Sequence, residues 1–320
     1  MQGNELVFET ALHALLQHLR EQAYTFTTVT PVTHARVIAN RHGAPGTSLR
    51  DMFGWSLRVA ASAGAPGLPD ELLQLLLDAG VIKREDDHYR SRVRVASFDG
   101  DLFVHSPFPT VAQDAVFFGP DTYRFLNLIR EHLPAAPSAP ERPLRVADVG
   151  CGSGAGGIIA ARLRVGAQVT LNDINPLALR YAAINAESAG VAVQLAPGDA
   201  LSQVGGDFDV VLSNPPYLED PQARAYRHGG GDLGRALSVK IGAQALQRLA
   251  PGGRLILYTG VAMVDGVDAF IREMEPFLGA CGCTYTYAEI DPDIFGEELE
   301  QPAYARADRI AAVGLVAVKA

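Results

Sequence analysis

The sequence predicts a doubly wound α/β fold with a mostly parallel sheet, preceded by a smaller module of helices and a hairpin. From Leu144 onward, short apolar runs alternate with helical segments across turns that contain glycine. A glycine-rich loop follows the first of these apolar runs, and two consecutive prolines end the fourth. Because parallel strands need crossover connections, the alternation predicts helices on both faces of one sheet.

Residues 1–110 are expected to form the N-terminal module, which we interpret as a substrate or partner domain. An amphipathic helix is expected over residues 4–22, a second from the Thr30-Pro31 start signal to about residue 40, and another over 68–80. Residues 89–95 and 102–105 flank Asp99-Gly100, which is a strong hairpin signal. Helices followed by a hairpin suggest a winged-helix-like arrangement.

Residues 111–320 are expected to form the α/β domain. A helix around residues 125–129 is followed by a proline- and alanine-rich connector over 134–143. Seven strands are expected, at 144–149, 168–172, 191–196, 209–213, 254–260, 284–290 and 310–319, and the last two should close the sheet as an antiparallel hairpin. Helices are expected over 157–164, 177–189 and 237–249.

Composition excludes several classes of protein. The chain has 48% hydrophobic and 20% charged residues, as in an ordinary globular protein, and no apolar stretch reaches the roughly 20 residues that span a bilayer. Its net charge of −9 disfavours a large nucleic-acid footprint, and residues 1–95 balance ten Arg/Lys with ten Asp/Glu. The three cysteines lack the spacing of a zinc site or a disulfide framework. We expect a cytoplasmic protein without a metal; the oligomeric state is not predicted.

The glycine-rich loop "VADVGCGSGAGG" (146–157) lies between a strand and a helix, where glycines permit a tight turn and close approach of a ligand to the backbone. Asp173 ends the second strand, 23 positions after Gly150, where a carboxylate can accept both hydroxyls of a ribose. Asp199 follows the third strand and can receive an adenine amino group. A dinucleotide is the alternative ligand, but the acidic Asp148 beside the loop would repel a pyrophosphate and suits an ammonium group.

The stretch "LSNPPYLEDP" (212–221) ends the fourth strand, because Pro215 and Pro216 each fix φ and remove a backbone donor. The side-chain carbonyl of Asn214 and the backbone carbonyl of Pro215 can each accept one N–H of a planar NH2 group. That arrangement favours a pyramidal nitrogen with its lone pair free for attack. Tyr217 can stack on a flat amide or base.

These motifs resemble class I S-adenosylmethionine-dependent methyltransferases of the NPPY amino-methyltransferase group, which act on glutamine amides, adenine N6 or guanine N2. The resemblance implies a seven-stranded Rossmann-like methyltransferase sheet and S-adenosyl-L-methionine as the cofactor. It implies that the NPPY residues Asn214, Pro215, Pro216 and Tyr217 are catalytic. The implied cofactor contacts are Asp148, Gly150, Cys151, Gly152, Gly154, Asp173, Ile174, Asp199, Ala200 and Asn214.

A second resemblance points to one family within this group of methyltransferases. In "VFFGPDTYRFLNLI" (116–129), the Pro-Asp-Thr run at 120–122 is similar to the segment that enters the catalytic domain of HemK/PrmC-type release-factor glutamine methyltransferases, a methyltransferase small domain family. Gly119 and Tyr123 depart from that pattern. "HGGGDLG" (228–234) is also similar. The resemblance covers about residues 112–262, and the first hundred residues do not resemble the helical substrate domain of that family.

The acceptor-binding candidates are Phe118, Thr122, Tyr217 and His228. Local alternatives are a core position for Phe118, a helix N-cap for Thr122 and plain solvent exposure for His228. The acidic segment 291–304 is expected to border the acceptor or to be a solvated loop.

Three hypotheses about the methyl acceptor follow from these motifs. The favoured one is a protein glutamine of the release-factor kind, which suits the acidic chain and the neutral N-terminal module. The second is an exocyclic amine of an RNA or DNA base, guanine N2 or adenine N6, which suits NPPY and a winged helix. The third comprises small-molecule N-methylation and a non-catalytic module that only binds the cofactor.

Overall fold

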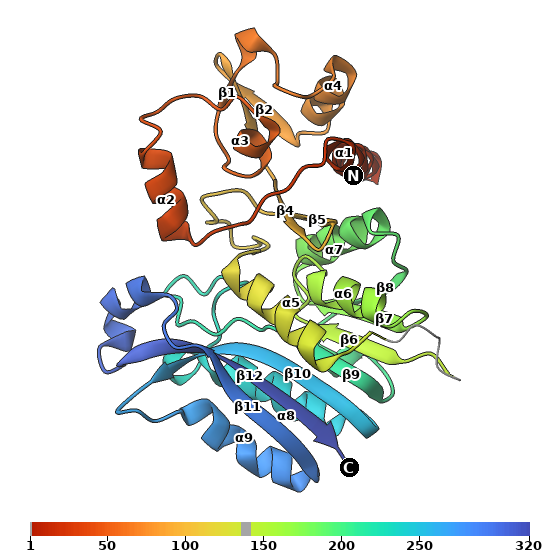
Figure 1. Cartoon of the computed structure of the whole chain (residues 1–320), viewed down its shortest axis with the longest axis vertical. Helices are drawn as coiled ribbons and strands as arrows, with labels where there is room; N and C mark the ends of the chain where they lie inside the picture. The colour runs from red at the N-terminus through yellow and green to blue at the C-terminus, as the bar shows by residue number, and fades with distance from the viewer. Residues whose placement is uncertain (1, 136–141) are drawn as a thin grey trace.

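The computed structural model describes residues 2–135 and 142–320, and its largest unit is a seven-stranded sheet in the order β11-β12-β10-β9-β6-β7-β8 (Figure 1). The strands are β6 (Arg145–Val149), β7 (Gln168–Asp173), β8 (Val193–Pro197), β9 (Phe208–Ser213), β10 (Leu249–Met263), β11 (Cys283–Asp291) and β12 (Arg309–Lys319). The first five run parallel, whereas β12 pairs antiparallel with both β10 and β11. The doubly wound, mostly parallel sheet is confirmed, with all seven expected strands.

Helices cover both faces of this sheet. The helices are α5 (Pro120–His132), α6 (Ala155–Leu163), α7 (Pro176–Ser188), α8 (Ala236–Gln247) and α9 (Ala269–Ala280). One core cluster joins α5, α6 and α7 to the sheet, and another joins α8 and α9 to it. Neighbouring residues of one strand divide between the two clusters, as Val146 and Ala147 do, because successive side chains point to opposite faces.

The N-terminal module lies above the sheet in Figure 1. It contains α1 (Gln2–Glu21), α2 (Pro31–Ala39), α3 (Leu49–Phe53), α4 (Asp70–Asp78) and the strands β1 (Val59–Ala60), β2 (Ile82–Glu85) and β3 (His88–Ser91) in the order β1-β3-β2. The expected start of α2 is present, since the Thr30 side chain accepts a hydrogen bond from the Thr33 N–H. A helix, a short strand, another helix and a hairpin in this order suit a winged-helix-like arrangement.

A single strand over residues 89–95 was expected, and this prediction is wrong because two separate strands share these residues. Tyr89 belongs to β3 and pairs with β1 and β2, whereas Arg94 begins β4 (Arg94–Phe98). The chain turns after Ser91, the last residue of β3. The Ser91 hydroxyl donates to the Val93 carbonyl and accepts from the Val93 N–H, which separates β3 from β4. The hairpin of β4 with β5 (Asp101–His105) is confirmed: its turn residues Asp99 and Gly100 have φ values of 52° and 85°, as a primed turn requires.

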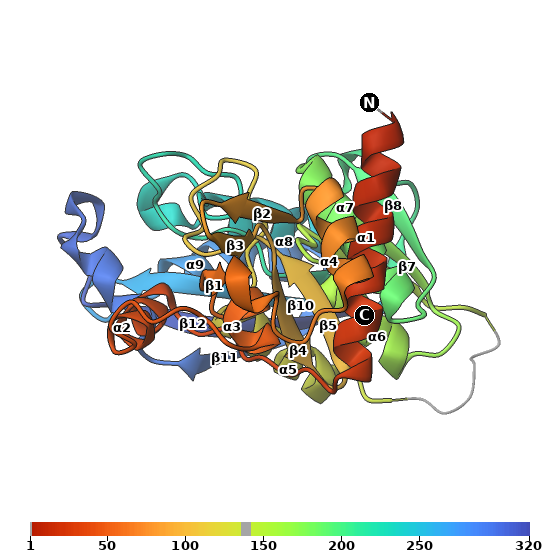
Figure 2. The same ribbon diagram turned by 90° about the horizontal axis from the view of Figure 1, so that it is seen from above.

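The N-terminal module and the α/β domain share buried contacts. Helix α1 lies beside α4 and α7 (Figure 2), and all three contribute to one apolar cluster. Asn185 of α7 is fully buried; it accepts from the Val104 N–H at 2.8 Å and donates to the carbonyls of Val104 and Ser153. The β4–β5 hairpin therefore packs into the core of the α/β domain, and a division after residue 110 stays a prediction. Residues 136–141 of the expected connector lie outside the described residues.

Candidate active site

A cavity opens at the carboxyl ends of β6, β7 and β9, where ligands bind in open α/β sheets. We call it the first cavity. Every position expected to contact the cofactor contributes to its lining except Gly154, although the neighbouring Ser153 and Ala155 do line it. The expected residues that line it are Asp148, Gly150, Cys151, Gly152, Asp173, Ile174, Asp199, Ala200 and Asn214.

The glycine-rich loop forms the floor of the first cavity. Gly150 and Gly152 have φ values of 68° and 53°, and a Cβ built on either residue would meet no atom within 4 Å. Glycine is therefore needed there for its backbone conformation, and the loop surface is open to a ligand. Gly154 starts α6 with a φ of 78°, and a Cβ there would lie 2.9 Å from the Cβ of Ala182, so this glycine permits close packing of α6 on α7.

Asp148 lines the first cavity and is 1% exposed. One oxygen of its carboxylate accepts a hydrogen bond from the Gly157 N–H at 2.8 Å. Burial raises the pKa of Asp148 to about 7, because the charged form loses its hydration. A ligand ammonium group beside this carboxylate would stabilise its ionised form, as the sequence analysis expects.

Asp173 and Asp199 also line the first cavity. The Asp173 carboxylate accepts from the Gly152 N–H at 2.9 Å and from the Asn175 N–H at 2.8 Å, so it is held in place with lone pairs left for ligand hydroxyls. Asp199 is exposed and forms an ion pair with Lys240 at 2.6 Å. Ile174 exposes 66% of its surface although it is a large apolar residue, and it lines the cavity, where a flat ring can cover it.

A second cavity adjoins the first. Its lining includes Asn214, Pro215, Pro216 and Tyr217 of the NPPY motif, and it shares Phe117, Asn214, Pro216 and Tyr226 with the first cavity. The side-chain amide of Asn214 forms no hydrogen bond with the described part of the chain, in contrast to the neighbouring Ser213 hydroxyl, which donates to the Val149 carbonyl at 2.8 Å. The motif thus sits where the two cavities meet.

Tyr217 is 8% exposed and is fixed on several sides. A Cβ on Gly260 would lie 2.3 Å from its ring, and the Phe295 ring meets it edge-on with centroids 6.2 Å apart. Asp121 lines the same cavity, and burial raises the pKa of Tyr217 well above its usual range. The residue therefore forms a rigid wall of the second cavity.

Three of the expected acceptor contacts, Phe118, Thr122 and His228, do not line the second cavity. Phe118 is 1% exposed and stacks on Phe103 and His105 in the core, away from both cavities. His228 lines neither cavity; its Nδ1 accepts from the Asp220 N–H at 3.2 Å and stabilises a loop. Thr122 lines the first cavity rather than the second. It is not the helix N-cap either, since it is the third residue of α5 and its hydroxyl accepts from the N–H of Gly119.

Other residues of the second cavity carry no local signal in the sequence. Pro31, Phe108, Pro109 and Thr110 come from the N-terminal part of the chain, and Phe295 comes from the segment between β11 and β12. Only tertiary packing brings these segments together.

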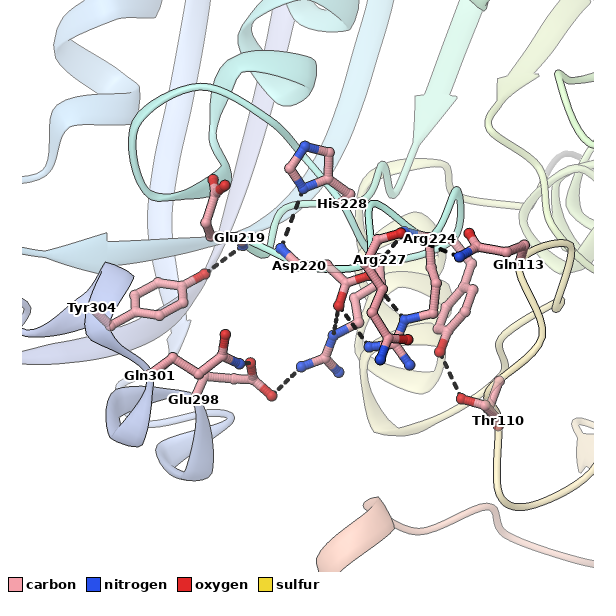
Figure 3. A network of polar contacts seen from close by, with 12 residues as sticks. Thr110, Gln113, Glu219, Asp220, Arg224, Arg227, His228, Glu298, Gln301 and Tyr304 are labelled. Carbon is pink, nitrogen blue, oxygen red and sulfur yellow. Dashed lines mark hydrogen bonds and ion pairs between the residues drawn. The ribbon is translucent and has the colours of Figure 1, made fainter.

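A network of ion pairs holds the loop that follows NPPY (Figure 3). Asp220 binds Arg224 through two hydrogen bonds of 2.9 and 2.6 Å, and Glu298 pairs with Arg227. The Tyr304 hydroxyl accepts from the Glu219 N–H at 2.8 Å. The acidic segment 291–304 borders the second cavity through Phe295, and its Glu298 is buried and paired with Arg227. That the segment also borders the acceptor stays a prediction.

Neither a membrane-crossing helix nor a metal-binding cluster occurs in the part of the chain that the structure describes. None of the helices there is long and apolar enough to cross a bilayer. No group of three or more His, Cys, Asp or Glu side chains within residues 2–135 and 142–320 is placed to hold a metal ion.

Comparison with known proteins agrees with this site. Residues 126–263 match the family described as methyltransferase small domain. The release factor glutamine methyltransferase of Deinococcus radiodurans is 31% identical over 195 residues, which cover 56% of this chain and 63% of that protein. The ribosomal RNA small subunit methyltransferase C of Chromohalobacter salexigens is 36% identical over 131 residues, 40% of this chain and 35% of that protein.

A solved structure shows the same fold at low sequence identity. Trm5b from Pyrococcus abyssi is 14% identical, with a TM-score of 0.50 over 79% of this chain and 72% of that one. The chain spans between 58% and 63% of the length of the first three curated relatives that it matches. Residues 126–263, which carry β6 to β10, the glycine-rich loop and NPPY, thus match the methyltransferase small domain family.

Proposed function

We propose that this chain is an S-adenosyl-L-methionine-dependent N-methyltransferase that acts on the NH2 group of a protein glutamine in the cytoplasm. The observation that carries the proposal is the position of Asn214: its amide has no partner among the described residues and faces both cavities. The cofactor supplies an electrophilic methyl group when it is bound. The first cavity suits it because the open surface at Gly150 and Gly152 and the buried carboxylate of Asp148 meet an amino-acid moiety.

The other residues of the chain orient the acceptor. The Asn214 carbonyl and the Pro215 backbone carbonyl each accept one N–H, which directs the nitrogen lone pair toward the first cavity. The two prolines restrict the backbone that carries these carbonyls before the acceptor arrives, since their φ angles are fixed. The low exposure of Pro215 and Tyr217 keeps water from this part of the cavity.

A nucleobase amine is the second candidate acceptor. The second cavity is lined by five aromatic side chains, Phe108, Phe117, Tyr217, Tyr226 and Phe295. Enzymes that modify a base hold it between aromatic and apolar side chains, and each stacking contact contributes about 1–3 kcal/mol. The similarity to a ribosomal RNA methyltransferase supports this candidate, whereas the net charge of −9 disfavours it.

The acceptor class is tested by incubating the enzyme and tritiated S-adenosylmethionine with cell lysate, then digesting with nuclease or protease. A protein acceptor predicts label that a protease releases and a nuclease does not. Label that only a nuclease releases would favour the base, and label that survives both would favour a small molecule. The Asn214→Ala variant gives the background incorporation. Absence of label above that background in every fraction would contradict the proposed function.

A further inference from the structure

Residues 107–115 lie between β5 and α5, and the orientation of the acceptor by Asn214 and Pro215 does not use them. The two ends of this loop are held together by Ser106 and Val116. The Ser106 N–H donates to the Val116 carbonyl at 3.0 Å, and the Val116 N–H donates to the Ser106 hydroxyl at 2.8 Å. The described backbone between these ends forms neither helix nor strand. We call residues 107–115 the strap.

The loop after NPPY binds the strap through two hydrogen bonds (Figure 3). The Tyr226 hydroxyl donates to the Thr110 carbonyl at 2.8 Å, and the Gln113 side chain donates to the Gln222 carbonyl at 3.2 Å. Because the ion pairs described above hold this loop, both bonds tie the strap to a fixed part of the α/β domain.

Asn175 binds the strap at another place. Its side chain donates to the Asp114 carbonyl at 2.7 Å, and its N–H donates to the Asp173 carboxylate at 2.8 Å. Asn175 follows β7 and Tyr226 follows β9, and β6 with the glycine-rich loop lies between these two strands in the sheet. Both side chains line the first cavity, as does Ala115 of the strap. The strap therefore spans the first cavity.

Hydrogen bonds, rather than apolar packing, hold the middle of the strap. Residues 111–114 are exposed, and Val111 exposes 64% of its surface although it is apolar. Phe108, near the start of the strap, is packed, since its ring stacks on His34 with centroids 3.9 Å apart. Segments with exposed hydrogen bonds and few buried apolar contacts open at a lower free energy than the rest of a fold. The middle of the strap is such a segment.

We propose that residues 107–115 form a strap over the first cavity that opens to admit and release S-adenosyl-L-methionine and closes to retain it. The inference rests on the proposed binding of this cofactor in the first cavity and not on the identity of the acceptor. The bonds from Tyr226, Gln113 and Asn175 must break before the strap opens. Because none of these bonds involves the cofactor, they slow its entry as well as its exit.

The test measures the rate constants for association and dissociation, kon and koff, of tritiated S-adenosylmethionine with the full chain. Tyr226→Phe keeps the ring in both cavities and removes its bond to Thr110, so koff should rise about fivefold. Gln113 lines neither cavity, and Gln113→Ala removes a longer, exposed bond, so koff should rise about twofold. In the double variant both kon and koff should rise about tenfold, and Kd should stay within about twofold of the wild-type value.

Two matched variants control for the loss of a hydrogen bond as such. Tyr287→Phe removes a hydroxyl that donates to Asp268 at 2.5 Å, and Gln74→Ala removes an exposed amide that donates to Asp78 at 2.7 Å. None of these four residues lines either cavity. Both variants should keep koff within about 1.5-fold of the wild-type value.

Two results would overturn the inference. One is a folded double variant with the wild-type koff. The other is a koff that rises together with Kd while kon is unchanged, because Tyr226 and Gln113 would then stabilise the bound cofactor directly and would not hold a strap closed. Neither rate constant requires an acceptor or a methyl transfer. The result is therefore independent of the proposed acceptor, which the labelling of the lysate tests.

Discussion

Asn214 and Asp173 have separable roles at the scale of single residues. Asn214 belongs to both cavities and is free to bond an acceptor, whereas Asp173 is already held by two backbone N–H groups beside the glycine-rich loop. A substitution at Asn214 should therefore affect the chemical step, and one at Asp173 should affect cofactor binding. Kinetics and calorimetry distinguish these outcomes.

Asn214→Ala is predicted to lower kcat by roughly 10²-fold or more, because one of the two oxygens that orient the acceptor nitrogen is lost. The Kd for S-adenosylmethionine, measured by calorimetry, should change little. If the variant instead lost cofactor affinity with kcat preserved, Asn214 would be a cofactor ligand and its role in orienting the acceptor would be wrong.

Asp173→Ala is predicted to weaken cofactor binding at least tenfold, since it removes the acceptor for ligand hydroxyls and a bond that holds Gly152. The same calorimetric titration measures it. Asp209→Ala is the matched control: Asp209 is a half-buried aspartate paired with Arg142 that lines neither cavity, and its variant should bind normally. Normal affinity in Asp173→Ala would remove the ribose assignment.

At the scale of elements, the sequence predicts those parts whose signals are local. Strands β6 to β9 follow from short apolar runs between glycine turns, and α2 follows from Thr30-Pro31. Helix α9 is missed because Pro276 interrupts its pattern, and the β2–β3 hairpin is missed because its turn contains Asp86 at a φ of 53° in place of glycine. The expected contacts at the first cavity follow from local signals for the same reason, because each lies in a loop directly after a strand or at the strand's end.

The walls of the second cavity depend on contacts between distant elements, which no local pattern specifies. Phe117 and Phe118 show why the sequence alone does not predict these walls. Both are apolar, and only the packing of Phe118 on Phe103 leaves Phe117 to line the cavity. His228 resembles a site residue by its place after NPPY, yet its ring bonds a backbone N–H. Residue type and spacing identify the chemistry of NPPY but not the side chains that surround the acceptor.

Asn185→Ala is predicted to destabilise the fold by about 3 kcal/mol at the junction of α7 with the β4–β5 hairpin. The substitution leaves the Val104 N–H and C=O and the Ser153 carbonyl buried without their partner. Urea unfolding measures the loss. The exposed Asn40→Ala variant should change the free energy of unfolding by less than about 0.5 kcal/mol. An equally small change in Asn185→Ala would show that this junction does not hold the two parts together.

At the scale of the whole molecule, the N-terminal module completes the second cavity rather than standing apart from it. Pro31, Phe108 and Thr110 line that cavity, and the Tyr226 hydroxyl donates to the Thr110 carbonyl at 2.8 Å. The acceptor group must therefore enter between the two parts of the chain. A slim side chain or an extruded base can do so more easily than an intact duplex.

The stability of the unliganded protein is predicted to carry a pH-dependent contribution from Asp148. The folded-state pKa of about 7 lies above the ordinary value of 3.8, so the native state binds the proton more tightly than the unfolded chain does. The contribution of Asp148 to the free energy of unfolding should therefore fall as the pH rises from about 4 to about 7. The total fall is about 4 kcal/mol at most. Asp148→Asn removes this part of the pH dependence in urea unfolding. An unchanged pH profile in that variant would contradict the raised pKa.

The most direct test of the central claim identifies the atom that receives the methyl group. The enzyme is incubated with S-adenosylmethionine that carries ¹³C in its methyl group, together with the labelled lysate fraction, and the product is examined by NMR. The account predicts a methyl resonance bound to an amide or exocyclic amine nitrogen, absent when Asn214→Ala replaces the wild-type enzyme. A methyl group on oxygen, sulfur or carbon would contradict the role assigned to NPPY.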